Sequence, residues 1–318
     1  MHPAGPNSAD SGAPDPEASR LVACLQSLME GESAVAELAA CGPRAIPPLR
    51  EFLLAGRVAS VPQPRMWAVD ALALLGAREV LIEYLQSSVS AADPQLQFAE
   101  DAVRNTAGRR LSAWRDDQTF EILLTVARRR QLPGVIETLA GFGRVEAMPC
   151  LDRALEDDLC RGAAEDGFRK LGPAARGALL VSAATPLPLG GEETPSSLCR
   201  RRSVLGLLAE IGVEPENWPE LRPLLEERDP EMLTRLAQIA ATVADAEGRA
   251  RAARALVGAL EGLPWFVRKD AEAALVALAP ESRAPIQAEV ARRSAKPPLV
   301  RAGDEVLRML LRIRPRTS

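Results

Sequence analysis

A twelve-residue pattern recurs along this chain and restricts its fold more than any other feature. Residues 65–76 read RMWAVDALALLG, and residues 161–172 read RGAAEDGFRKLG. Arg, Ala, two large apolar residues and Gly fall at the same offsets in both copies. The Ala lies eight residues before the Gly and the apolar residues lie four and one before it, which places all three on one face of a helix. Each copy therefore predicts an amphipathic helix that ends at the Gly.

The closing small residue of this pattern recurs at intervals of 29 to 40 residues, at Gly42, Gly76, Ala107, Gly143, Gly172, Gly212, Ala244, Ala279 and Leu311. Each interval has room for two helices and a short loop. A single pair of helices cannot bury its apolar face, so such pairs form a continuous core only by stacking. We therefore expect an all-α fold, an α-solenoid of about nine helix pairs.

The full pattern, Arg-x-x-Ala-x-x-x-Leu-x-x-Leu-Gly preceded by Pro or Asp-Pro, resembles the HEAT and HEAT-like (PBS-lyase-type) repeats. The best matching copies are residues 65–76, 161–172, 201–212 and 268–279. The resemblance covers roughly residues 20–315 and implies a right-handed solenoid, with the second helix of each pair lining a concave face. The copies that close near 107, 244 and 311 lack the Arg and the Gly, so their boundaries stay open.

Composition places the repeats in a single domain between two short tails. Residues 1–18, rich in Pro, Gly, Ser and Asp, predict a disordered N-terminal tail. We expect one solenoid over residues 19–315, with a long loop at 184–198 and a tail at 316–318. The start of the chain lacks the pattern of a secretory signal, and no apolar run is long enough to span a membrane. Five cysteines without a CxxC motif favour reduced thiols, which suits a protein of a bacterial-type cytoplasm.

The chemistry missing from the sequence argues against an enzyme. The single histidine, His2, lies in the predicted tail, which removes Ser-His-Asp and Cys-His catalysis and HExxH metal sites from the folded part. No P-loop is present, and no GxGxxG follows a predicted strand. We therefore expect no catalytic residue, no metal and no cofactor. Catalysis by carboxylates alone remains open.

An acidic residue stands six positions before the closing residue in four consecutive repeats, at Asp70, Asp101, Glu137 and Asp166. If the second helices line a concave face, these four residues form an acidic stripe along it. The stripe is a candidate docking track for a basic segment of a partner. The alternative is a solvated face that neutralises itself, because Asp101 and Asp166 each have an Arg three residues on.

Arginine clusters give a second candidate. Arg200, Arg201 and Arg202 follow the longest internal loop and open a predicted helix, where the helix dipole disfavours cations. Glu192 and Glu193 of the loop, or an anionic partner, should compensate them. By contrast, residues 128–130 close a predicted helix, where cations are favourable. The recurrent Arg at 65, 161, 201 and 268 is expected to brace the repeats rather than to touch a ligand.

These features favour a non-enzymatic scaffold or adaptor that binds proteins on the curved surface of a HEAT-like solenoid. The partner would be a protein, with a basic segment for the acidic stripe. One alternative is a nucleic-acid-binding protein like the HEAT-like DNA alkyl-base glycosylases, although the formal net charge of −4 argues against it. Another is a helper of the phycobilisome-lyase type, which handles a bilin on a client protein. The oligomeric state stays open.

Overall fold

The computed structural model describes residues 15–55, 59–87, 93–297, 301 and 303–313, and every regular element in these ranges is a helix. Most of the predicted N-terminal tail, residues 1–14, lies outside the described residues, as does the predicted tail at 316–318. The boundary at residue 18 is wrong, because α1 (Pro16–Cys24) begins before it. The Asp15 side chain accepts a hydrogen bond from Glu17 N, and Pro16 occupies the first turn.

The chain forms two compact units, residues 1–142 and 143–318, where we expected one domain over 19–315. The boundary falls at Gly143, which closes a repeat as its counterparts elsewhere do. The repeat pattern continues through this point, so it does not mark the division. Each unit is described by itself.

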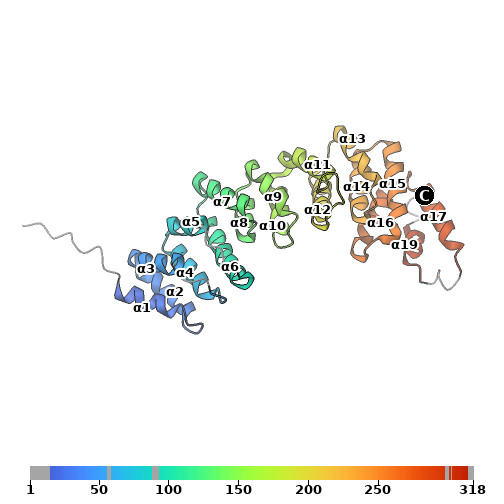
Figure 1. Cartoon of the computed structure of the whole chain (residues 1–318). Helices are drawn as coiled ribbons and strands as arrows, with labels where there is room; N and C mark the ends of the chain where they lie inside the picture. The colour runs from blue at the N-terminus through green and yellow to red at the C-terminus, as the bar shows by residue number, and fades with distance from the viewer. Residues whose placement is uncertain (1–14, 56–58, 88–92, 298–300, 302, 314–318) are drawn as a thin grey trace, which may run out of the picture. The chain divides into compact units, whose positions relative to one another are not determined.

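The first unit consists of helix pairs that pack in two rows (Figure 1). The pairs are α1 and α2 (Gly31–Ala40), α3 (Ile46–Leu54) and α4 (Gln63–Leu74), α5 (Arg78–Gln86) and α6 (Pro94–Arg110), and α7 (Asp117–Arg129) and α8 (Pro133–Phe142). Helices α2, α4, α6 and α8 contact one another in succession and form the even row, while α1, α3, α5 and α7 form the odd row. The buried Ala, Val and Leu side chains of the repeat fill the space between the rows.

The second unit follows the same scheme. Its helices are α9 (Met148–Ala154), α10 (Arg161–Leu171), α11 (Arg176–Ala184), α12 (Pro195–Ile211), α13 (Trp218–Leu221), α14 (Pro230–Val243), α15 (Ala246–Ala259), α16 (Arg268–Ala277), α17 (Arg283–Ser294) and α19 (Glu305–Ile313). One row is formed by helices that contact one another in succession, α10, α12, α14, α16 and α19. Outside this row, α11 packs against α12 and α15 packs against α14. Among the described residues no strand is present, so the fold is all-α.

Local sequence determines where several helices begin and end. The Asp-Pro pairs at 93–94 and 229–230 start α6 and α14 as predicted, with each Asp side chain accepting from a backbone amide of the first turn. Gly76 and Gly172 have φ of 69° and 56°, a region that favours glycine. Ala107 does not end its helix, because α6 continues to Arg110.

The predicted long loop at 184–198 is shorter in the structure. Helix α11 ends at Ala184, and α12 already begins at Pro195, so the loop spans 185–194. The Thr194 side chain accepts a hydrogen bond of 3.2 Å from Ser197 N and caps α12. The predicted end of the loop at residue 198 is therefore four residues too late, because it was based on composition and did not take the Thr194 cap into account.

Gly134, at the start of α8, lies directly against the backbone of the neighbouring helix α6. A Cβ atom on Gly134 would lie 2.1 Å from the backbone oxygen of Asn105 on α6. At the other end of α8, a Cβ on Gly141 would meet only the Arg115 guanidinium, at 3.5 Å. The first glycine is therefore required by packing, whereas the second is not.

We predict that Gly134→Ala lowers the free energy of unfolding by about 1–3 kcal/mol, because the backbones of α6 and α8 must separate. The matched variant Gly141→Ala should be neutral or more stable by up to about 1 kcal/mol, since alanine is the better helix former. Urea unfolding followed by circular dichroism measures both. Equal stability of the two variants would contradict a close backbone contact at Gly134.

Candidate docking groove and charged clusters

The acidic stripe falls on successive helices, as predicted for its first three members. Asp70 lies on α4, Asp101 on α6 and Glu137 on α8, all in the even row of the first unit, and Asp166 lies on α10 of the second unit. Each carboxylate faces an arginine: Asp70 pairs with Arg110 at 2.7 Å, Asp101 with Arg130 at 2.5 Å, Glu137 with Arg109 at 2.8 Å and Asp166 with Arg169 at 3.0 Å. The stripe therefore carries little net charge with which to attract a basic segment.

One of the two expected local pairs is wrong. Asp166 pairs with Arg169 three residues on, as predicted. Arg104 instead pairs with Glu100, with 3.2 Å between its Nε and the Glu100 Oε1. Asp101 pairs with Arg130, directly after the end of α7. Glu100 is fully buried and also pairs with Arg65, so two interior cations share this one carboxylate.

The cluster around Glu100 holds three helices of the first unit together. Arg65 on α4 and Arg104 on α6 both lie over the ring of Tyr84 on α5, at 5.4 and 5.3 Å from its centre. The Tyr84 hydroxyl donates to Glu100 at 2.7 Å, and burial raises the pKa of Tyr84 so that the hydroxyl keeps its proton. The cluster is a buried structural network of charge-assisted hydrogen bonds.

Arg200, Arg201 and Arg202 do not open their helix, contrary to our prediction. Helix α12 begins at Pro195, so the arginines lie beyond its first turn, where the dipole effect has faded. Arg200 and Arg201 are only 2% and 1% exposed. Buried cations of this kind brace the fold rather than form an open anion site.

Partners inside the protein compensate all three. Arg201 pairs with Glu193 and Glu227, each at 2.7 Å, so the loop carboxylate expected to compensate this cluster does so through Glu193. Arg200 donates to Thr185 O at 2.6 Å and pairs with Glu156, and Arg202 pairs with Asp229 and Glu231.

The recurrent Arg of the repeat holds the two helices of a pair together. Arg65 donates to Leu53 O at 2.8 Å, Arg161 to Leu155 O at 2.9 Å and Arg201 to Ala183 O at 2.8 Å. Each carbonyl lies at the end of the preceding helix, where backbone oxygens lack helical partners and attract cations. Arg268 differs, because it pairs with Glu305 on α19.

We predict that Arg201→Met lowers the free energy of unfolding by about 2 kcal/mol or more, since Glu193 and Glu227 lose their shared cation. The neighbouring Arg202→Met should cost about 1 kcal/mol or less, because its ion pairs are partly exposed. Denaturant titration of both variants tests the structural role. Similar small losses in the two variants would contradict the structural role of Arg201.

A groove between α2, α4 and α6 of the first unit is the strongest candidate docking site. It holds about 470 Å³ and is lined by Glu32 and Val35 of α2, Trp67, Asp70, Ala73 and Leu74 of α4, Arg109 and Arg110 of α6, and Ser112, Ala113 and Trp114 beyond it. We call it the tryptophan groove. Trp67 is largely buried, whereas Leu74 is 67% exposed. Exposed apolar surface beside aromatic rings is typical of a recognition site.

Close packing and charge pairing shape this groove. A Cβ on Gly31 would lie 2.1 Å from the Trp67 ring, so the glycine lets the indole lie against the start of α2. Asp70 and Arg110 pair on its wall, and Glu32 and Arg109 bring one further charge of each sign. The groove therefore combines apolar side chains with charges that balance overall. Of the residues that line this groove, the sequence indicated Asp70 and gave no sign of Leu74.

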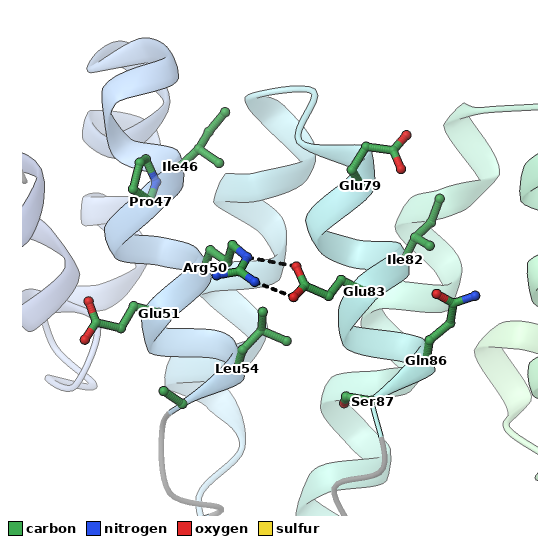
Figure 2. Close-up of a pocket in the computed structure, with 11 residues that line it drawn as sticks. Ile46, Pro47, Arg50, Glu51, Leu54, Glu79, Ile82, Glu83, Gln86 and Ser87 are labelled. Carbon is green, nitrogen blue, oxygen red and sulfur yellow. Dashed lines mark hydrogen bonds and ion pairs between the residues drawn. The ribbon is translucent and has the colours of Figure 1, made fainter. Parts of the chain in front are cut away.

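A larger groove lies between α3 and α5 on the odd row and holds about 1000 Å³ (Figure 2). Figure 2 shows Arg50 of α3 reaching across it to Glu83 of α5, and the Arg50 hydrogen bond lowers the pKa of Glu83. Glu51 and Glu79 also line it, and both are exposed. Mobile charged side chains at an exposed site contribute little binding energy, so this groove is the weaker candidate.

A small crevice in the second unit is lined by charge. Arg169, Arg202 and Arg235 face Glu165, Glu210 and Glu231 around a volume of about 250 Å³. Arg169 pairs with Glu210 at 2.7 Å, and Arg235 pairs with Asp270 at 2.8 Å. The equal numbers of opposite charges make this crevice an internal network between helices.

The cysteines offer free thiols. None of the five forms a disulfide, and Cys150 and Cys160 are buried. Burial, together with the adjacent Asp157 carboxylate, raises the pKa of Cys160 to about 12. A thiol with this pKa is almost wholly protonated at neutral pH and is a poor nucleophile.

We predict that iodoacetamide at pH 8 labels Cys160 in the native protein at least about tenfold more slowly than the partly exposed Cys41. The reason is that only the thiolate reacts, and burial both keeps the Cys160 thiol protonated and limits access to it. Mass spectrometry of timed digests gives both rates, and guanidinium should remove the difference. Equal native rates would contradict the buried, protonated state.

Within the described ranges, no group of three or more His, Cys, Asp or Glu side chains is placed to hold a metal ion, and His2 lies outside those ranges. None of the described helices has the length and apolar character needed to cross a membrane. No family model matches the chain, and no curated protein matches it in sequence.

Proposed function

We propose that this protein is a non-enzymatic scaffold that binds a protein partner on the even row of its first unit, with the tryptophan groove as the anchor site. Its helix pairs would be HEAT-like repeats of a right-handed α-solenoid. The successive packing of α2, α4, α6 and α8 supports this architecture, because each helix packs mainly on its neighbours along the row.

The observation that carries the proposal is the exposed Leu74 beside Trp67 and Trp114. A groove of about 470 Å³ can accept one or two apolar side chains of a docked helix or strand. The paired charges on its wall, Asp70 with Arg110, would form a polar rim around this contact. A partner that inserts an apolar anchor fits this site better than the purely basic segment that the sequence suggested.

The use of charge elsewhere supports binding over catalysis. Glu100, Arg200 and Arg201 are buried and engaged in pairs that join helices. Catalytic groups instead need an accessible position beside a substrate. These three residues therefore stabilise the fold, and the tryptophan groove would bind the partner.

We expect tagged protein to recover a stoichiometric protein partner from its native lysate, with and without nuclease, as read by mass spectrometry. Leu74→Asp should weaken the purified partner's binding at least about tenfold, because it places a charge against the apolar anchor. The matched control Leu159→Asp changes a leucine of similar exposure, 75%, in the second unit and should bind normally.

Loss of recovery on nuclease treatment would refute the scaffold proposal in favour of nucleic-acid binding. Equal binding of the partner by Leu74→Asp and Leu159→Asp would show that the tryptophan groove is not the anchor site. Circular dichroism of both variants establishes that the substitutions leave the helices intact.

A further inference from the structure

A second pocket of the first unit lies where α5 and α7 end, beside Arg104 of α6. It holds about 470 Å³ and is lined by Leu85, Gln86, Ser87, Arg104, Thr125, Val126, Arg129, Arg130 and Leu132. We call it the arginine pocket. Three of these nine side chains are guanidinium groups, and none is a carboxylate.

Positive charge is in excess around the arginine pocket. Arg65 and Arg104 share the single carboxylate of Glu100, and Arg130 pairs with Asp101. Among the described residues, the Arg129 guanidinium has no hydrogen-bond or ion-pair partner. Four cations thus face two carboxylates, which leaves an excess of two positive charges in a protein whose formal net charge is −4.

The helix ends cancel only part of this excess. Each helix C-terminus carries roughly half a negative charge, so α5 and α7 together offset about one. Arg104 already covers the end of α5, donating to Leu85 O at 3.1 Å and to Ser87 O at 2.9 Å. Capping of a helix C-terminus therefore explains the position of Arg104. It does not explain Arg129, or the guanidinium nitrogens of Arg130 that do not contact Asp101.

The base of the pocket is apolar. Leu85, Val126 and Leu132 are all buried and line it beneath the guanidinium groups. The hydroxyls offer no further donors, because Ser87 donates to Tyr84 O and Thr125 donates to Glu121 O. Arg129 and Arg130 are therefore the groups that can contact a bound anion directly, with Arg104 acting through its charge.

We propose that the arginine pocket binds a phosphate monoester whose organic part rests on Leu85, Val126 and Leu132. A phosphate monoester carries about −1.5 to −2 charges at pH 7 and is therefore attracted by the excess of about one positive charge that remains after the helix ends are counted. Two guanidinium groups bind its oxygens through charge-assisted hydrogen bonds. The pocket is larger than a bare phosphate requires, so an attached aryl or alkyl group fits it.

The test uses the full chain and phenyl phosphate, titrated at low ionic strength by isothermal calorimetry. We expect saturable one-site binding that weakens as salt is added. Inorganic phosphate should bind at least about tenfold more weakly, since it lacks the apolar part. Arg129→Gln and Arg130→Gln should each weaken phenyl phosphate binding at least about tenfold.

Arg128→Gln is the matched control, because Arg128 belongs to the same run of arginines but does not line the pocket. It should bind phenyl phosphate like the unaltered chain. Equal weakening by Arg128→Gln, or no saturable binding by the unaltered chain, would overturn the proposal. Urea unfolding of each variant separates loss of binding from loss of folding.

A phosphotyrosine peptide distinguishes the two sources of such a group. Binding at least about tenfold tighter than that of phenyl phosphate would assign the pocket to a phosphorylated protein segment. Equal binding would assign it to a free small phosphate ester. This proposal does not depend on the tryptophan groove, and Leu74→Asp should leave phenyl phosphate binding unchanged.

Discussion

Both units depend on arginine side chains, most of them buried, that donate hydrogen bonds to backbone oxygens at the ends of neighbouring helices. Arg65, Arg104, Arg161 and Arg201 each donate to a backbone oxygen at or just beyond the end of the preceding helix. An unpaired interior cation would cost several kcal/mol, so each must also find negative charge. Arg65 and Arg104 find it in Glu100, and Arg201 in Glu193 and Glu227. These bonds fix how one helix of a pair lies on the other.

Charged side chains at the surface are also paired within the protein, which leaves few surfaces as candidate binding sites. The ion-paired residues of neighbouring pairs stand about one repeat apart in the chain: Asp70 and Arg110 by 40 residues, Asp101 and Arg130 by 29, and Arg169 and Glu210 by 41. Charges used in this way join helices and leave little net charge to attract a partner. The tryptophan groove and the arginine pocket stand out because one exposes apolar surface and the other retains positive charge.

Much of the fold could be predicted from the sequence. The repeat placed helices around residues 65–76, 161–172, 201–212 and 268–279, and the Asp-Pro pairs marked the starts of α6 and α14. Boundaries that rested on composition were less accurate, since Asp15 and Thr194 cap helices inside segments predicted as tail or loop. The tryptophan groove was predicted less well: Asp70 was identified from the sequence, but Leu74 and Arg110 were not.

The sequence by itself determined that the chain is helical, where most helices lie and which faces are apolar, because these properties follow from side-chain spacing of 3.6 residues per turn. It also placed Asp70, Asp101 and Glu137 on successive helices of one row. Only the tertiary structure decided which arginine Asp70, Asp101 and Glu137 meet, that Arg200 and Arg201 are buried, and that the chain divides at Gly143. The reason is that a repeat specifies the same local geometry in every copy, whereas pairing and burial depend on the side chains of the neighbouring copy.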